Sequence, residues 1–163
     1  KFPKKGGVVF VPVEHEGNAQ GSEEEAEEIA KIANKLIGAT YWKSDDDGAK
    51  LHIGWQDMLF VAPYNYQVNL LKAVLPSDAL IGSVDKFQGQ EAPIVFVSMC
   101  TSDPSESPRG LDFIFSKNRL NVAISRGQSL AIIVGSPKLG STPVGNLRQM
   151  GLVNFYSAIM EYQ

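Results

Sequence analysis

Apolar and polar positions divide the chain into short strand-like runs separated by helical patterns. Four apolar runs, rich in Val, Ile and Phe and without alternation of apolar and polar residues, span residues 8–13, 58–62, 94–99 and 130–134. Continuous runs of this length are typical of strands that are buried on both faces of a parallel sheet. The pattern therefore predicts four buried strands.

The first predicted helix has clear signals at its N-terminus. Ser22, followed three residues later by Glu25, is typical of a capping box, and five glutamates between residues 23 and 28 complement the positive end of a helix dipole. Apolar residues then recur at helical spacing as far as Ile37. We interpret the glutamates as a solvated helix start.

Three further helices are predicted, and together with the strands they define the fold class. They span residues 64–75, which Pro76 ends, about 116–127, and 144–161 with a break at Gly151. Strands that alternate with helices at this spacing predict an α/β fold with a mostly parallel sheet. We expect a single domain over residues 1–163.

Two segments are predicted to be loops. Residues 41–55 contain three consecutive aspartates and separate a helix from a buried strand. Residues 101–111 contain two prolines and directly follow the end of a buried strand. Ligands of parallel sheets bind beyond the carboxyl ends of the strands, so the second loop lies where a site is expected.

Composition limits the classes of function. Fifteen Lys and Arg against eighteen Asp and Glu leave a net charge of −3, so any contact with nucleic acid must be a local patch. The single cysteine, Cys100, permits no intrachain disulfide and no cysteine metal cage, which fits a reducing, cytoplasmic compartment. No apolar run approaches the roughly 18 residues of a membrane span, so no membrane partner is expected.

One segment comes close to a phosphate-binding loop. Residues 135–142 follow a buried strand with nearly the spacing of a P-loop, but Ser141 stands where a P-loop needs lysine. No Gly-x-Gly-x-x-Gly run is present either. His15 and His52 have no companions at metal-ligand spacing, so we interpret each as a surface or loop residue and expect no metal site.

Two other segments are better candidates for chemistry. In residues 83–91, Ser-Val-Asp-Lys-Phe-Gln-Gly-Gln-Glu, Gly89 allows close backbone approach and Glu91 places a carboxylate where it can accept hydrogen bonds from ribose hydroxyls. The alternative is a glycine turn that leads into a strand. In residues 119–126, Arg-Leu-Asn-Val-Ala-Ile-Ser-Arg, Arg119 and Arg126 recur on nearly one helix face, which favours an anionic partner over a pair of surface arginines.

Taken together, these segments resemble motifs of superfamily 1 helicases. Residues 62–67 (Ala-Pro-Tyr-Asn-Tyr-Gln), 83–91 and 119–126 resemble motifs IV, V and VI in order and spacing, and residues 134–138 (Val-Gly-Ser-Pro-Lys) resemble the strand that follows. The branch is the one that includes the nonsense-mediated-decay RNA helicase and the DNA replication helicase-nuclease. The resemblance implies a RecA-like, three-layer domain of the P-loop NTPase type that lacks its own P-loop. It would be the second such domain, excised from a longer chain.

The resemblance also implies roles for individual residues on the nucleotide side. Arg126 would be the arginine finger that reaches the γ-phosphate of ATP, Gly89 and Glu91 would line the nucleotide, and Arg119 would support the same face. ATP and Mg²⁺ would be held mainly by the missing first RecA-like domain, because this chain carries no Walker A or Walker B motif.

On the nucleic-acid side, the resemblance implies that Ser83 contacts the backbone of a single strand, and it assigns Tyr64 and Gln67 of motif IV to the same partner. The expected function is that of the C-terminal motor domain of an ATP-dependent helicase, inactive as an isolated fragment. The alternative is a non-catalytic nucleic-acid or protein interaction module derived from a helicase domain. A small-molecule enzyme is a third possibility, for which the sequence offers no nucleophile, acid-base pair or metal cluster.

Overall fold

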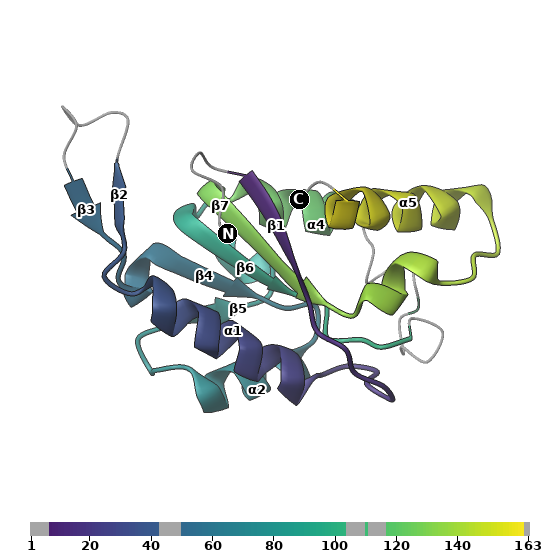
Figure 1. Cartoon of the computed structure of the whole chain (residues 1–163), viewed down its shortest axis with the longest axis horizontal. Coiled ribbons are helices and arrows are strands. Elements are labelled where there is room, and N and C mark those ends of the chain that lie inside the picture. The colour runs from purple at the N-terminus through teal and green to yellow at the C-terminus, as the bar shows by residue number, and fades with distance from the viewer. Residues whose placement is uncertain (1–6, 43–49, 104–109, 111–116, 162–163) are drawn as a thin grey trace.

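A computed structural model describes residues 7–42, 50–103, 110 and 117–161. Five strands form one parallel sheet in the order β1-β7-β6-β4-β5. They are β1 (Gly7–Pro12), β4 (Met58–Val61), β5 (Leu80–Gly82), β6 (Ala92–Ser98) and β7 (Gly127–Gly135). A separate antiparallel hairpin pairs β2 (Thr40–Trp42) with β3 (Lys50–His52) and projects away from the sheet (Figure 1).

Helices cover both faces of the sheet (Figure 1). On one face lie α1 (Glu23–Leu36) and α2 (Asn65–Val74), and on the other lie α4 (Lys117–Ser125) and α5 (Leu147–Glu161). Three short 3-10 helices complete the described elements: η1 (Trp55–Asp57), η2 (Asp85–Phe87) and η3 (Pro137–Ser141). The predicted three-layer α/β fold with a parallel sheet is confirmed.

Each face of the sheet has its own apolar core. Towards α1 and α2, Phe60 and Phe96 stack on neighbouring strands with ring centroids 5.0 Å apart. Towards α5, Phe10 and Tyr156 meet edge to face at 5.5 Å. Every residue of β4 is buried, as its continuous apolar run predicts.

The structure corrects two predictions about elements and adds one strand that the sequence pattern did not predict. Residues 41–55 are not a single loop, because they contain β3 and the last two residues of β2, and η1 begins at their last residue. β5 was not predicted, since it has only three residues at the edge of the sheet. The break predicted at Gly151 is wrong, because α5 runs through it without interruption, and a helix tolerates one glycine at a cost of about 1 kcal/mol.

The connections leave two neighbouring strands of the sheet, β4 and β6, in opposite directions. The chain leaves β4 through α2 towards β5, but it leaves β6 through α4 towards β7 on the other side. Strand order therefore reverses between β4 and β6, and in open parallel sheets ligands bind at the carboxyl ends beside such a reversal. Within the described part of the chain, no helix is both long and apolar enough to cross a membrane.

Candidate functional site

The structure divides the predicted site residues between two opposite edges of the sheet. Gly89 and Glu91 directly precede β6 at its amino end. Arg126 lies beside them, because its carbonyl accepts a hydrogen bond from the main-chain N–H of Ala92, the first residue of β6, at 3.0 Å. These three residues, with Gln90 and Gln128, form what we call the Arg126 cluster.

Three of the other four predicted residues lie at the carboxyl edge. Tyr64 and Gln67 follow β4, and Ser83 directly follows β5. Residues 83–91 connect the two edges, because the end of β5 is aligned through β4 with Val97 near the end of β6, whereas Glu91 precedes the start of β6. Phe87 anchors this segment in the core with 2% of its surface exposed.

Arg126 is held in an unusual hydrogen-bonding state. It directly follows α4, where the negative end of the helix dipole favours a cation. Its Nη1 donates to the main-chain carbonyl of Gln90 at 3.0 Å, whereas its buried Nε has no hydrogen-bond partner among the residues that the structure describes. A buried donor without an acceptor costs about 1–3 kcal/mol, more when it is charged, so this guanidinium is suited to receive an anion.

Glu91 is exposed on the same side. One carboxylate oxygen accepts a hydrogen bond from the side-chain amide of Gln128, near the start of β7, at 3.3 Å. A carboxylate has acceptor sites for about four hydrogen bonds, so Glu91 keeps capacity for the hydroxyls of a ribose.

Gly89 has a backbone conformation that favours glycine, with φ of +78°. A Cβ atom built at this position would meet no described atom within 4 Å. Glycine is therefore favoured here by the backbone conformation of the turn. No close contact within the described chain requires it. This agrees with the glycine-turn interpretation and leaves the expected nucleotide contact as a prediction.

Arg119 lies in α4, but its side chain is outside the described residues. Arg126 itself lies one residue beyond the end of the helix, so the argument from a shared helical face does not extend to it. The expected support of the nucleotide face by Arg119 stays a prediction.

Gln67 is buried, with 0% of its surface exposed, and its amide is used inside the protein. Its Oε1 accepts from the main-chain N–H of Ser22 at 2.7 Å, and its Nε2 lies within donating distance of the Ser22 carbonyl and of the Ser98 hydroxyl, at 3.1 and 3.0 Å. Gln67 therefore ties α1 to β6, and we withdraw it from the expected contacts with nucleic acid.

Tyr64 and Ser83 differ in what they offer to a partner. Tyr64 directly precedes α2 without capping it through its side chain, and it is buried in the core with Val61 and Phe87. Ser83 is half-buried, and its carbonyl accepts from the main-chain N–H of Lys86 at 3.1 Å, which begins η2. Of the three residues assigned to nucleic acid, Ser83 keeps the clearest access to solvent.

A buried polar network at the carboxyl edge was not predicted. Glu25 has 0% of its surface exposed, and its Oε1 lies 2.8 Å from Nε2 of His15. Its Oε2 accepts from the Ser98 hydroxyl at 2.6 Å and from the main-chain N–H of Cys100 at 2.9 Å. The interpretation of the glutamates as a solvated helix start is therefore wrong for Glu25.

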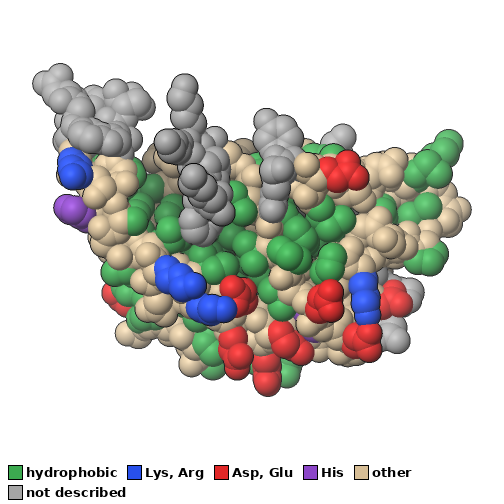
Figure 2. All heavy atoms as spheres, in the orientation of Figure 1, with side chains coloured by type: hydrophobic (Ala, Val, Ile, Leu, Met, Phe, Trp, Pro, Cys, Tyr) green, Lys and Arg blue, Asp and Glu red, His purple; other side chains and the backbone are tan. Residues whose placement is uncertain are grey.

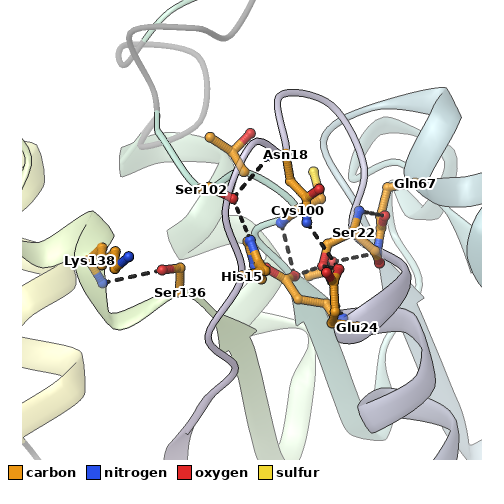
Figure 3. Close-up of polar contacts among 12 residues, drawn as sticks. His15, Asn18, Ser22, Glu24, Gln67, Cys100, Ser102, Ser136 and Lys138 are labelled. Carbon is orange, nitrogen blue, oxygen red and sulfur yellow. Dashed lines mark hydrogen bonds and ion pairs between the residues drawn. The ribbon is translucent and has the colours of Figure 1, made fainter.

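The same network extends from His15 to the loop after β6. The Ser102 hydroxyl lies 2.6 Å from Nδ1 of His15 and accepts from the main-chain N–H of Asn18 at 3.1 Å (Figure 3). All partners are satisfied when Ser102 donates to Nδ1 and Nε2 carries the ring proton towards Glu25. His15 is thus a loop residue, as expected, but a buried one.

The N-terminus of α1 explains both the success and the failure of the capping prediction. Ser22 accepts from the main-chain N–H of Glu25 at 3.1 Å, as a capping box requires. The Glu25 side chain does not return to Ser22, because Gln67 occupies that position. A signal in the sequence was available: Glu25 lies four residues before the buried Ile29 and therefore on the same helix face.

Burial also affects the thiol beside this network. Burial, and to a smaller extent the charge of Glu25, raise the pKa of Cys100 well above its usual value. Cys100 is a buried free thiol with φ of +51°, a conformation that is uncommon outside glycine.

The segment that resembles a P-loop has a different structure. Residues 137–141 form η3, which Ser136 caps by accepting from the main-chain N–H of Lys138 at 3.3 Å. The ammonium of Lys138 pairs with Glu16, whose pKa is lowered by this hydrogen bond and by the positive charge. Lys138 is therefore engaged with a carboxylate at the carboxyl edge.

Comparison with known proteins agrees with the geometry. A family model described as an AAA domain matches residues 4–138. The chain is 37% identical over 87 residues to the probable RNA helicase armi of Drosophila melanogaster and 38% identical over 89 residues to RNA helicase Mov10l1 of Mus musculus. It is 27% identical over 122 residues to the DNA replication ATP-dependent helicase/nuclease JHS1 of Arabidopsis thaliana.

These alignments cover 48%, 50% and 74% of this chain but only 7%, 8% and 8% of the three relatives. The chain thus spans less than a tenth of the length of each. The parallel sheet between two helical layers agrees with the RecA-like fold that the sequence predicts. The chain belongs to the AAA domain family, as a superfamily 1 helicase domain of the branch that includes the nonsense-mediated-decay and DNA replication helicases.

Proposed function

We propose that this chain is the C-terminal motor domain of an ATP-dependent superfamily 1 helicase and that Arg126 is its arginine finger. The observation that carries the proposal is the incomplete hydrogen bonding of that guanidinium. One nitrogen is fixed by the Gln90 carbonyl, and another is buried without an acceptor among the described residues. A phosphate oxygen is the acceptor that such a site fits best.

The residues of the Arg126 cluster fit two parts of ATP, the γ-phosphate and the ribose. The guanidinium fits the γ-phosphate, and the exposed Glu91 carboxylate fits the ribose hydroxyls. The sequence carries no Walker A or Walker B motif, so we place the Mg²⁺ ligands on the first RecA-like domain. That domain of the same full-length protein is thus the main partner.

The mechanism follows from what each residue can do. Bound ATP supplies a γ-phosphoryl group whose transfer is stabilised mainly by positioning and by positive charge. Arg126 provides that charge when the two domains close, and Glu91 orients the nucleotide through its ribose. Because residues 83–91 run from Ser83 to Glu91, closure at one edge of the sheet is coupled to the nucleic-acid contact at the other.

The nucleic-acid track is proposed to lie at the carboxyl edge near Ser83. Acidic side chains gather over α1 on the face seen in Figure 2, where Glu23, Glu24 and Glu27 are exposed. Phosphates are repelled by such a surface, so the track avoids α1. The partner is single-stranded DNA or RNA, since the relatives include proteins named for each. The single buried thiol, Cys100, supports a cytoplasmic location.

The test compares the isolated chain with the full-length protein that carries it. The full-length protein should hydrolyse ATP with Mg²⁺ and be stimulated by single-stranded DNA or RNA. The isolated chain should hydrolyse ATP no faster than buffer and bind single strands weakly, with strong salt dependence. Robust turnover by the isolated chain would contradict the assignment.

The alternative function predicts a different pattern. A non-catalytic interaction module would bind nucleic acid or protein tightly, and its binding to single strands would survive high salt. The full-length protein would then show no stimulated ATP turnover.

A further inference from the structure

The turn at Gly89 lies directly before the carbonyl that fixes Arg126. We infer that Gly89 is a positioning residue for Arg126: its left-handed backbone aims the Gln90 carbonyl at the guanidinium. This inference rests on the proposed role of Arg126 as the arginine finger. It assigns Gly89 a function that differs from lining the nucleotide.

The backbone of the turn selects glycine at position 89. Gly89 has φ of +78°, which costs an L-residue other than glycine roughly 1–2 kcal/mol, whereas a Cβ here would meet no described atom within 4 Å. The conformation, and not space, therefore selects glycine. The next residue closes the turn, because the main-chain N–H of Gln90 donates to the Phe87 carbonyl at 2.9 Å.

Contacts on both sides of the turn fix its position relative to Arg126. Phe87 is buried, so the start of the turn is anchored in the core. On the far side, Ala92 donates to the Arg126 carbonyl at 3.0 Å, and Arg126 returns a bond from Nη1 to the Gln90 carbonyl at 3.0 Å. Two hydrogen bonds thus join the turn to both the main chain and the side chain of Arg126.

The kind of acceptor matters for the function. A main-chain carbonyl fixes the direction of a guanidinium without neutralising its charge, which a carboxylate would do. Among the described residues, no acidic side chain forms an ion pair with Arg126. The full positive charge therefore stays available for the charge that develops on the phosphate oxygens.

The test replaces Gly89 by Asn, Ala or Val in the full-length protein, with ATP turnover measured at saturating single strand. Asn adopts positive φ far more readily than Ala, and β-branched Val adopts it least. Turnover is therefore expected to decrease in the order Gly, Asn, Ala, Val. Because a misplacement of about 1 Å can cost roughly 100-fold, Gly89→Val should lower kcat by about 10- to 100-fold, with the KM for ATP changed less than about threefold.

A matched control uses a second glycine with the same backbone. Gly38 has φ of +79°, and a Cβ there would also meet nothing within 4 Å, but it follows α1 and bonds to Ile53, outside the Arg126 cluster. The same three substitutions at Gly38 add the same backbone strain. They should leave kcat within about twofold of the wild type once the folded fraction is equalised.

A double substitution tests whether Gly89 acts through Arg126. In an Arg126→Ala background, Gly89→Val should change kcat less than about twofold, because residues that act as a unit are not additive. Two results would overturn the inference: an order set by size, with Asn worse than Ala and a loss in KM, or a full additional loss in the Arg126→Ala background. If Arg126→Ala itself leaves turnover unchanged, the proposed function fails as well, so the two failures are distinguishable.

Discussion

The carboxylate of Glu25 accepts a hydrogen bond at 2.9 Å from the main-chain N–H of Cys100, which holds a positive φ of 51°. The contact joins the first turn of α1 to the loop residue two positions after the end of β6. Positive φ costs a non-glycine residue of order 1–3 kcal/mol, and such a conformation persists only when its surroundings impose it. The bond to Glu25 is one of the contacts that hold this segment, beside the main-chain bonds from Met99 to Val134 and from Ser102 to Asn18.

We expect Glu25→Ala to lower the free energy of unfolding by roughly 2–5 kcal/mol, since it leaves the His15 ring N–H and the Cys100 N–H buried without their acceptor, and each such unpaired donor costs about 1–3 kcal/mol. Denaturant unfolding of the 163-residue chain measures this. Glu27→Ala is the matched control on the same helix, because Glu27 is exposed and should cost less than about 0.5 kcal/mol. Equal and small effects of the two substitutions would show that the network contributes little.

The pH dependence of stability should carry a signature of Glu24. A hydrogen bond from its own main-chain N–H, then those from the Ser22 hydroxyl and the Asn18 amide, lower the pKa of Glu24 below its usual value of 4.5. The unfolded chain therefore binds more protons than the folded chain as the pH falls below 4.5. The contribution of Glu24 is present above pH 4.5 and is lost as the pH falls through the lower, folded-state pKa.

This prediction is checked by urea unfolding of the wild type and Glu24→Gln between pH 7 and pH 2.5. The wild type should be more stable at pH 7, and the difference should shrink below pH 4.5. A difference that stays constant over the whole range would contradict the cause assigned to the lowered pKa.

The features that the sequence predicted well are those that depend on local pattern. Continuous apolar runs predicted β1, β4, β6 and β7, and the spacing of Ser22 and Glu25 predicted the start of α1 within one residue. The three-residue β5 was not predicted, because its position depends on pairing with β4 and not on its own pattern.

The candidate site was predicted less completely, for a physical reason. The resemblance to helicase motifs assigned Gly89, Glu91 and Arg126 to one nucleotide site, and the structure places them side by side in the Arg126 cluster. Motif spacing could not show that Gln67 is buried, because its partners Ser22 and Ser98 lie 45 and 31 residues away in the chain. Side chains that bond over such distances depend on the tertiary fold.

Glu91→Ala in the full-length protein should weaken nucleotide binding, because one or two hydrogen bonds from a carboxylate to ribose hydroxyls contribute roughly 1.5–3 kcal/mol each. Equilibrium titration with a fluorescent nucleotide measures the affinity, and Glu27→Ala again serves as the control. Glu91 is exposed, so the melting temperature should be unchanged. Unchanged affinity with a lowered melting temperature would give Glu91 a structural role.

The most direct test of the account is the effect of Arg126 on ATP turnover in the full-length protein at saturating single strand. An arginine finger acts on charge that develops in the transition state, so turnover should fall by about 10³- to 10⁵-fold in Arg126→Ala, roughly 4–7 kcal/mol of barrier, while nucleotide affinity largely survives. Arg126→Lys should recover little, since an ammonium lacks the planar fork of donors.

Arg148→Ala is the control in the same measurement, because Arg148 is an exposed arginine of α5 outside the Arg126 cluster. It should leave turnover within about twofold of the wild type. The account predicts a large loss in both Arg126 variants with ATP still bound. A loss of less than tenfold in Arg126→Ala, or full activity in Arg126→Lys, would contradict it.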